Sequence, residues 1–210
     1  MGLIFMTMVS LSDQRGVYMS TMREALTRYF DDNGFGADGG YAATWVDFKV
    51  GPIPFPLPNP EARRKAVKFH DLNHVLTGYR TDLAGEFEIS AWEIGAGCRT
   101  FAAAWVLNLS GTNAGAFLWP RRTWRAFVAG RRSRAAAYEL DYEQALSEQV
   151  EDVKRRLEIH TEGKARVSDV VLYASAVMGG AFTASLLMAA VLSPISLVLW
   201  WRGRQLKTAS

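Results

Sequence analysis

Near its C-terminus the sequence contains the uncharged run VVLYASAVMGGAFTASLLMAAVLSPISLVLWW (Val170–Trp201), which is bounded by Asp169 and Arg202. The run is 32 residues long, whereas about 20 apolar residues are enough to cross the hydrocarbon core of a bilayer. A surface helix of a small soluble domain normally has one polar face, and this run has none. Two complete crossings would need about 40 residues and a turn, so the run predicts a single transmembrane helix.

A proline inside the run suggests where this helix ends. Pro194 lacks a backbone N–H and disfavours a continuous helix, so we expect a helix from about Val170 to Leu192. Trp200 and Trp201 would then lie at the level of the lipid head groups. Three basic residues follow in the water phase, namely Arg202, Arg204 and Lys207.

The charges on either side of the run predict its orientation. Five basic residues precede the run, namely Lys154, Arg155, Arg156, Lys164 and Arg166, against the three that follow it. Because basic flanks tend to stay in the cytoplasm, we expect a single-pass membrane protein with a cytoplasmic domain. The first residues lack a basic region and a cleavage motif, which predicts no signal peptide. The single cysteine, Cys98, fits a reducing compartment.

Small residues recur at every fourth position of the run, at Ala176, Gly180 and Ala184. This spacing lets two membrane helices approach closely, so it is one indication of a homo-oligomer. The alternative is a helix that is merely rich in alanine and glycine.

The residues before the run have the composition of one globular domain. Hydrophobic residues make up 49% of the chain and charged residues 21%, close to globular averages. Apolar residues recur at helical spacing over about 12–32, 60–77, 82–104 and 141–157, without alternating strand pairs joined by hairpin turns. The sequence therefore predicts an all-α fold: a single helical domain over 1–165, followed by a C-terminal transmembrane anchor over 168–202.

A proline-rich segment separates the first two predicted helices. It reads Gly51-Pro52-Ile53-Pro54-Phe55-Pro56-Leu57-Pro58-Asn59-Pro60. Proline at every second position excludes both a helix and a sheet ladder, so we expect a stiff extended strap. Its apolar residues would pack on the domain, and recognition by a partner that binds proline motifs is the alternative. Asn59 and Pro60 are typical of a helix start.

Two of the three histidines of the chain lie four residues apart on the helix that follows. His70 and His74 therefore project from one helix face and can share a metal ion. Asp71 can join them or orient an imidazole, and Glu86, just after a short turn, can return its carboxylate toward both. Two imidazoles with one or two carboxylates suit zinc or iron. The alternative is a chance histidine pair with ordinary surface acids.

The stretch His70-Asp71-Leu72-Asn73-His74, followed after eleven residues by Glu86, resembles a family motif. The motif is the His-Asp-x-x-His and distal Glu of the Coq-four family of coenzyme Q (ubiquinone) biosynthesis proteins. The pieces Gly85-Glu86 and Gly130-Arg131-Arg132-Ser133 and the helix over 141–159 are also similar to that family. The resemblance covers roughly residues 50 to 160 and is most specific in the histidine motif.

The resemblance implies an all-helical fold and a divalent metal at His70, Asp71, His74 and Glu86, where Asp71 either binds the metal or tunes His70. It also implies work on long-tailed quinone precursors at a membrane surface, alongside other quinone-biosynthesis enzymes. The family is associated with organising those enzymes and with oxidative removal of the ring carboxyl group. The metal would polarise that carboxylate or activate a bound water or oxygen species. The run Val170–Trp201 departs from the family pattern.

Basic residues form two further groups that could meet lipid head groups or other phosphates. They are Arg63, Arg64 and Lys68 in one helix, and Arg121 and Arg122 in a basic and aromatic stretch from Trp119 to Arg134. An ordinary solvated surface is the alternative. We expect no nucleic-acid partner, because the net charge of +3 is modest and no recognisable binding motif accompanies these residues.

Three functions are compatible with these patterns. The first is a metal-dependent enzyme of quinone or prenyl-lipid metabolism, such as a decarboxylase of a quinone precursor. The second is a non-catalytic lipid-binding scaffold for biosynthetic enzymes. The third is a different metal-dependent lipid hydrolase or oxidase. The sequence does not decide between them, because all three would use the same helical fold and the same ligand set.

Overall fold

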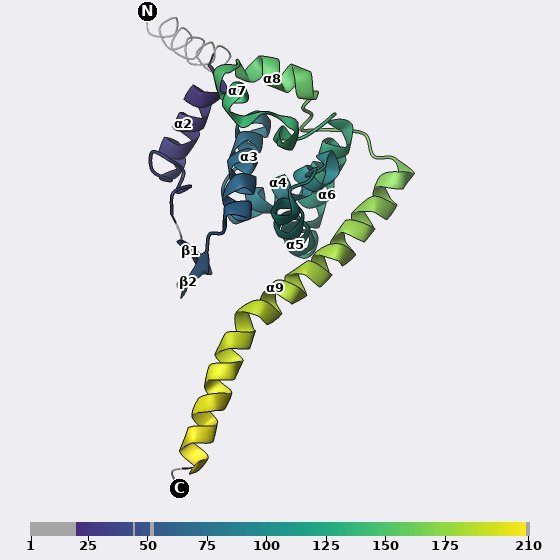
Figure 1. Ribbon diagram of the computed structural model, residues 1–210. Helices are drawn as coiled ribbons and strands as arrows, with labels where there is room; N and C mark the ends of the chain where they lie inside the picture. Colours follow the sequence, from purple (N-terminus) through teal and green to yellow (C-terminus); the bar gives the residue numbers. More distant parts are fainter. Residues whose placement is uncertain (1–19, 44, 51–52, 209–210) are drawn as a thin grey trace, which may run out of the picture.

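The structure is a computed structural model that describes residues 20–43, 45–50 and 53–208, with side chains described over 20–43 and 59–189. Helices dominate this part of the chain, which confirms the predicted helical domain followed by one long apolar helix (Figure 1). In chain order the elements are α2 (Met22–Asn33), β1 (Trp45–Val50), β2 (Ile53–Pro58), α3 (Glu61–Thr77), α4 (Leu83–Ala96), α5 (Ala102–Leu118), α6 (Pro120–Arg132), the short 3-10 helix η1 (Ala137–Glu139), α7 (Tyr142–Ser147), α8 (Val150–Leu157) and α9 (Val167–Thr208).

The helices at the centre of the domain, α4 and α6, pack against each other through two glycines. A Cβ atom at Gly95 would overlap the backbone oxygen of Phe127, and one at Gly130 would overlap the backbone oxygen of Trp92. The two backbones can therefore approach more closely than larger side chains would allow. Trp92 is fully buried beside this contact and Phe127 nearly so, which fixes the position of α4.

A second apolar cluster joins α2, α3 and α8. Its members include Met22 and Leu26 from α2, Leu72 and Leu76 from α3, and Val153 from α8. The N-terminus of α2 is held by a capping box, in which Thr21 and Glu24 each accept a hydrogen bond from the other's backbone N–H. This cluster fixes α2 beside the helix that carries the two histidines.

The proline-rich segment differs from the expected strap. Its residues form β2, which pairs with β1 in an antiparallel two-stranded hairpin. The prediction that prolines would exclude a ladder is wrong because only alternate residues of an antiparallel strand direct their N–H toward the partner. Pro54, Pro56 and Pro58 occupy one alternation, so Ile53, Phe55 and Leu57 retain the N–H groups between them.

The predicted break at Pro194 is also wrong. Helix α9 is continuous for 42 residues and includes this proline. A proline within a helix removes one hydrogen bond and favours bending, and an apolar helix can absorb that change. Figure 1 shows α9 running along the domain and then turning away from it.

The first half of α9 packs on the domain instead of standing apart from it. The amide of Asn113 on α5 donates to the backbone oxygen of Val177 at 2.9 Å, and Ser110 Oγ lies 2.9 Å from Thr183 Oγ1. A Cβ atom at Gly180 would overlap the backbone oxygen of Leu109. At the start of α9, the buried Asp169 pairs with Arg132, and Ala176 is buried further along. The small residues Ala176 and Gly180 are therefore used within the chain.

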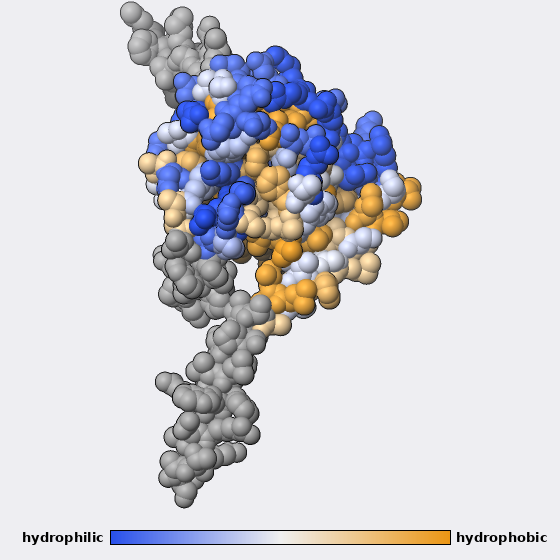
Figure 2. Space-filling model, in the orientation of Figure 1, coloured by the Kyte–Doolittle hydropathy of each residue, from blue (hydrophilic) through white to orange (hydrophobic). Residues whose placement is uncertain are grey.

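Among the described residues, α9 is the one helix long and apolar enough to cross a membrane. The stretch that meets this criterion is Val167–Ala189, and most of its residues are not buried. Figure 2 shows hydrophobic side chains along this part of α9 and a hydrophilic surface at the opposite end of the domain, around α7 and α8.

Candidate metal centre

A short turn between α3 and α4 brings the predicted ligands together. Helix α3 ends at Thr77, and the left-handed conformation of Gly78 then reverses the chain. Asp82 then starts α4 by accepting a hydrogen bond from the N–H of Gly85 at 2.8 Å. A Cβ atom at Gly85 would overlap the backbone oxygen of Arg80, so this position needs glycine. The tight turn places Glu86 opposite His70 and His74.

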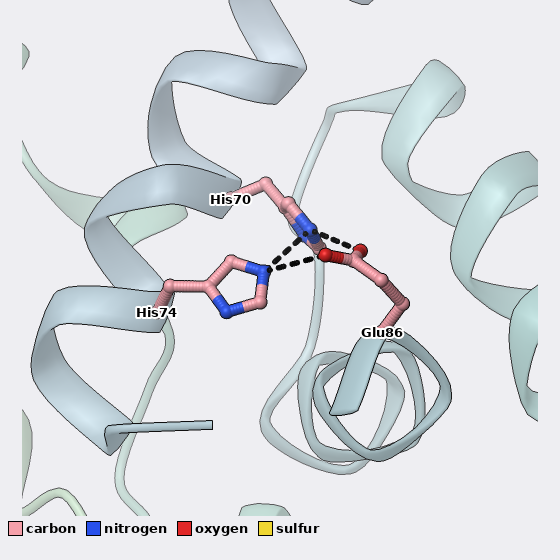
Figure 3. A group of neighbouring side chains, drawn as sticks. All are labelled: His70, His74 and Glu86. Atoms are coloured by element: carbon pink, nitrogen blue, oxygen red, sulfur yellow. Dashed lines mark hydrogen bonds and ion pairs between the residues drawn. The ribbon is translucent and has the colours of Figure 1, made fainter. Parts of the chain in front are cut away.

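The three side chains form a compact group that could hold a metal ion (Figure 3). The Nε2 atoms of His70 and His74 lie 3.2 Å apart, and each lies 3.4 Å from an oxygen of Glu86. Ligand atoms around a tetrahedral zinc ion, with bonds of about 2.0–2.1 Å, are about 3.3–3.4 Å apart. The observed separations therefore match those of three ligands around one small metal ion.

The other ring nitrogen of each histidine is engaged by an acceptor. His74 Nδ1 lies 2.8 Å from the backbone oxygen of Tyr79, and His70 Nδ1 lies 2.9 Å from Oε1 of Glu93. A carbonyl oxygen and a carboxylate can only accept, so each Nδ1 carries the hydrogen and donates it. Both Nε2 atoms are then the ones that can bind a metal.

Glu93 was not among the predicted site residues, yet it is central to the site. Its carboxylate is completely buried and accepts hydrogen bonds from Asn73, Asn108 and Tyr138 as well as from His70. Burial by itself would raise the pKa of Glu93, but the positive charge of His70 and these hydrogen bonds lower it. Glu93 therefore stays ionised. Its position seven residues after Glu86, on the same helix face, is the sequence signal that could have indicated it.

Asp71 faces away from this group. Its carboxylate accepts hydrogen bonds from the hydroxyls of Tyr41 at 2.6 Å and Tyr29 at 3.3 Å. The ring of Tyr29 in turn stacks on His74, with ring centroids 5.4 Å apart. Burial raises the pKa of Asp71. The structure thus brings three of the four predicted ligands together and places Asp71 behind them, where it positions Tyr29 against His74.

The charges of the site suit a divalent cation. Burial would raise the pKa of Glu86, but hydrogen bonds and positive charge from His70 and His74 lower it to about 2. Burial lowers the pKa of His70, yet the carboxylates of Glu93 and Glu86 raise it well above 6.5. Two ionised carboxylates therefore lie within contact of the histidine pair, and together they balance a charge of +2.

A cleft of about 460 Å³ borders the site on the side of His74. It lies between α2 and the turn that follows α3, and its walls include Tyr29, His74 and Tyr79. Arg28 and Arg80 line the same cleft together with Asp32 and Asp82, so the cleft carries charges of both signs. A small polar molecule could therefore come close to His74 from this side.

The basic residues predicted to meet phosphates lie on two different helices, α3 and α6. On α3, Arg63 and Arg64 donate hydrogen bonds to Asn59, and the ammonium group of Lys68 lies over the rings of Tyr41 and Tyr142. On α6, Arg122 makes a bidentate ion pair with Glu88, while Arg121 is exposed.

In comparisons with known proteins, no family model, no curated protein and no solved structure matches the chain.

Proposed function

We propose that this chain is a membrane-associated metal-binding protein of ubiquinone biosynthesis that acts on, or presents, polyprenylated quinone precursors. One observation carries the proposal. The His-Asp-x-x-His and distal Glu motif, on which the family resemblance rests, brings His70, His74 and Glu86 into contact at spacings suited to one metal ion. The apolar helix α9 supports the choice of a long-tailed, membrane-soluble substrate.

We further propose that the metal is zinc or iron. Two imidazoles and one carboxylate leave room for an additional ligand in either case. When bound, such an ion supplies Lewis acidity that polarises a carboxylate or carbonyl group of the substrate. The protein's own part is to hold the two histidines in one tautomer, through Glu93 and the backbone oxygen of Tyr79, and to keep Glu86 ionised.

The finer form of the proposal is oxidative removal of the ring carboxyl group. That reaction breaks the bond between the ring carbon and the carboxyl group, releases carbon dioxide and forms a ring hydroxyl. Dioxygen supplies the new oxygen atom, and its second atom leaves as water with two electrons and two protons from an external reductant. The substrate's tail would lie in the bilayer beside α9, with the domain on the cytoplasmic side.

The first test is the metal content of the full chain purified in detergent. Elemental analysis should find about one metal ion per chain in the parent protein and almost none in His70→Ala and Glu86→Ala. Glu88→Ala is the matched control, since Glu88 lies on the same helix but pairs with Arg122. A parent protein that folds and holds no metal would overturn the proposal.

A second test separates turnover from presentation. Membranes that contain the parent protein should convert a prenylated hydroxybenzoate precursor, with release of carbon dioxide, and those with His70→Ala should not. If the parent binds the precursor and the metal but releases no carbon dioxide, the protein presents the lipid to other enzymes. If it binds metal and ignores the precursor, the quinone assignment is wrong.

A further inference from the structure

We propose that α5 enters the lipid together with α9, so that the two helices form one lipid-facing surface and the domain lies directly on the membrane. This inference goes beyond the proposed function, because it concerns a helix of the domain and holds whether or not the site binds metal. The occupant to which it commits is the bilayer.

The two helices are antiparallel and joined along their length. Contacts pair Leu109 with Gly180, Ser110 with Thr183, and Asn113 with Val177. The earlier α5 positions, 109 and 110, meet the later α9 positions, 180 and 183, whereas Asn113 meets Val177, so the two helices run in opposite directions. Any placement of α9 in a membrane therefore carries α5 with it, unless these contacts break.

Helix α5 has the polarity of a membrane helix. It contains no charged residue. Its amide side chains point inward, since Asn108 bonds to Glu93 and Asn113 to the backbone of α9, and the hydroxyl of Ser110 meets Thr183. The residues of α5 that remain exposed are all apolar: Ala102, Leu107, Phe117 and Leu118. The hydroxyl of Thr112 is also buried, with no hydrogen-bond partner among the described residues. Polar groups turned inward and apolar groups outward are what a hydrocarbon environment requires.

The exposed residues of α5 and α9 form an apolar surface. Phe117 is 76% exposed and follows Asn113 by one helical turn, so it lies on the side of α5 that meets α9. Leu107 and Leu118 are three turns apart, so they lie on one side of α5, next to the side that carries Phe117. On α9 the exposed large side chains include Val171, Met178 and Phe182. Figure 2 shows hydrophobic regions on α9 and on the domain surface beside it.

The length of α9 favours lipid over a second copy of the chain as the occupant. One crossing takes about 20 residues, which is fewer than the 32 in the uncharged run. If Val167–Ala189 crosses, α5 packs on the crossing segment itself. If the later part of the run crosses instead, the residues that contact α5 lie at the bilayer surface. In both cases the exposed face of α5 meets lipid.

A border of aromatic and basic residues marks where α5 would leave the membrane. Trp119 follows the exposed pair Phe117 and Leu118, and Arg121 and Arg125 come next on the exposed surface of α6. Aromatic rings prefer the membrane interface, and guanidinium groups bind lipid phosphates. This order of residues matches the passage from acyl chains to head groups.

The test labels one introduced cysteine of the full chain in vesicles of phosphatidylcholine and phosphatidylglycerol. Phe117→Cys reports on α5, Phe182→Cys on α9, and Glu143→Cys, on α7 at the hydrophilic end, is the control. The side chain of Glu143 is 76% exposed, which matches Phe117. Each variant is labelled with an environment-sensitive fluorophore, and the parent protein, whose Cys98 is buried, serves as the labelling blank.

Labels at positions 117 and 182 should both emit at shorter wavelength in vesicles and lose fluorescence when nitroxide-labelled lipid is included. The label at 143 should show neither change. Quenching at 182 without quenching at 117 would overturn the proposal, since α9 would then enter the membrane alone. Labels at 117 and 182 that are shielded from water yet not quenched by the lipid would also overturn it, and would indicate a second copy of the chain.

Discussion

The Nδ1 atom of His70 lies 2.9 Å from Oε1 of Glu93, a carboxylate with no exposed surface. This contact fixes the ring orientation of His70 and presents its Nε2 to Glu86 and His74. Carboxylates behind metal-binding histidines make the histidine a stronger ligand. The same contact gives Glu93 a role in the site without requiring it to touch the metal.

Replacing Glu93 should weaken metal binding while the ligands stay in place. Glu93→Gln keeps the shape of the side chain but removes the negative charge, and it cannot accept all four hydrogen bonds that Glu93 receives. We expect metal affinity to fall by about 10- to 100-fold, as for other residues that support metal ligands. Competition with a chromophoric chelator measures this, with Glu88→Gln as the control. Equal affinity in the parent and Glu93→Gln would refute the role.

Replacing Asp71 should affect stability more than metal content. In Asp71→Asn the hydroxyls of Tyr29 and Tyr41 lose a charged acceptor, so we expect a loss of about 1–3 kcal/mol in the free energy of unfolding. Metal content should stay near one ion per chain, because Asp71 lies outside the ligand group. Chemical denaturation and elemental analysis measure the two quantities. Loss of the metal in a folded Asp71→Asn protein would show that Asp71 is a ligand.

Two neighbouring glycines of α9 should respond differently to alanine. At Gly180 a Cβ atom would overlap the backbone of Leu109, so Gly180→Ala should cost about 1–3 kcal/mol through overpacking. A Cβ atom at Gly179 would lie 3.9 Å from the nearest atoms of Leu109, which is an ordinary contact. Gly179→Ala should therefore leave the free energy of unfolding unchanged or raise it by up to about 1 kcal/mol. Thermal unfolding in detergent compares the two variants. Similar melting temperatures would mean that α9 does not pack on α5.

Cys98 should resist thiol reagents in the folded protein. Burial raises the pKa of its thiol, and the nearby carboxylate of Glu93 raises it further. Because the thiolate is the reactive form, a maleimide should label Cys98 at neutral pH only after denaturation. Mass spectrometry of native and denatured samples gives the answer. Rapid labelling of the native protein would contradict the buried position of Cys98 beside Glu93.

The grouping of His70, His74 and Glu86 could be predicted from the sequence because its geometry is local. Positions 70 and 74 share a helix face in any α-helix. Because the turn after them is short, the next helix runs back alongside the first. The position of Asp71 follows from the same geometry, since adjacent residues on a helix face different directions. The role of Glu93 in the site was harder to predict from the sequence. Two of its hydrogen-bond partners, Asn108 and Tyr138, come from elements distant in the sequence.

The apolar run could also be identified from the sequence, but α5, the helix on which it packs, could not. An uncharged sequence indicates that a helix is removed from water, but it does not indicate which side of the helix contacts protein. The contacts of Asn113 with Val177 and of Ser110 with Thr183 depend on how the helices before α9 fold. The paired strands of the hairpin were missed for a related reason. Each proline was judged by itself, whereas the spacing of the prolines is what allows the pairing.

Metal binding should release a proton from His70. Burial lowers the pKa of His70, but the carboxylates of Glu93 and Glu86 raise it well above 6.5, so without metal Nε2 carries a proton at neutral pH. A metal ion needs the lone pair of that nitrogen and must displace the proton. Apparent metal affinity should therefore rise with pH by about tenfold per pH unit below the pKa of His70, and level off above it.

Isothermal titration calorimetry in buffers of different ionisation enthalpy counts the protons released, and we expect about one per metal ion from His70. The Glu93→Gln variant is the informative control. Without the carboxylate of Glu93 the pKa of His70 should fall, so the rise of affinity with pH should end at a lower pH than in the parent. A parent protein whose metal affinity is the same across the neutral pH range would show that His70 is already deprotonated. It would refute the expectation that the metal displaces a proton from Nε2 of His70.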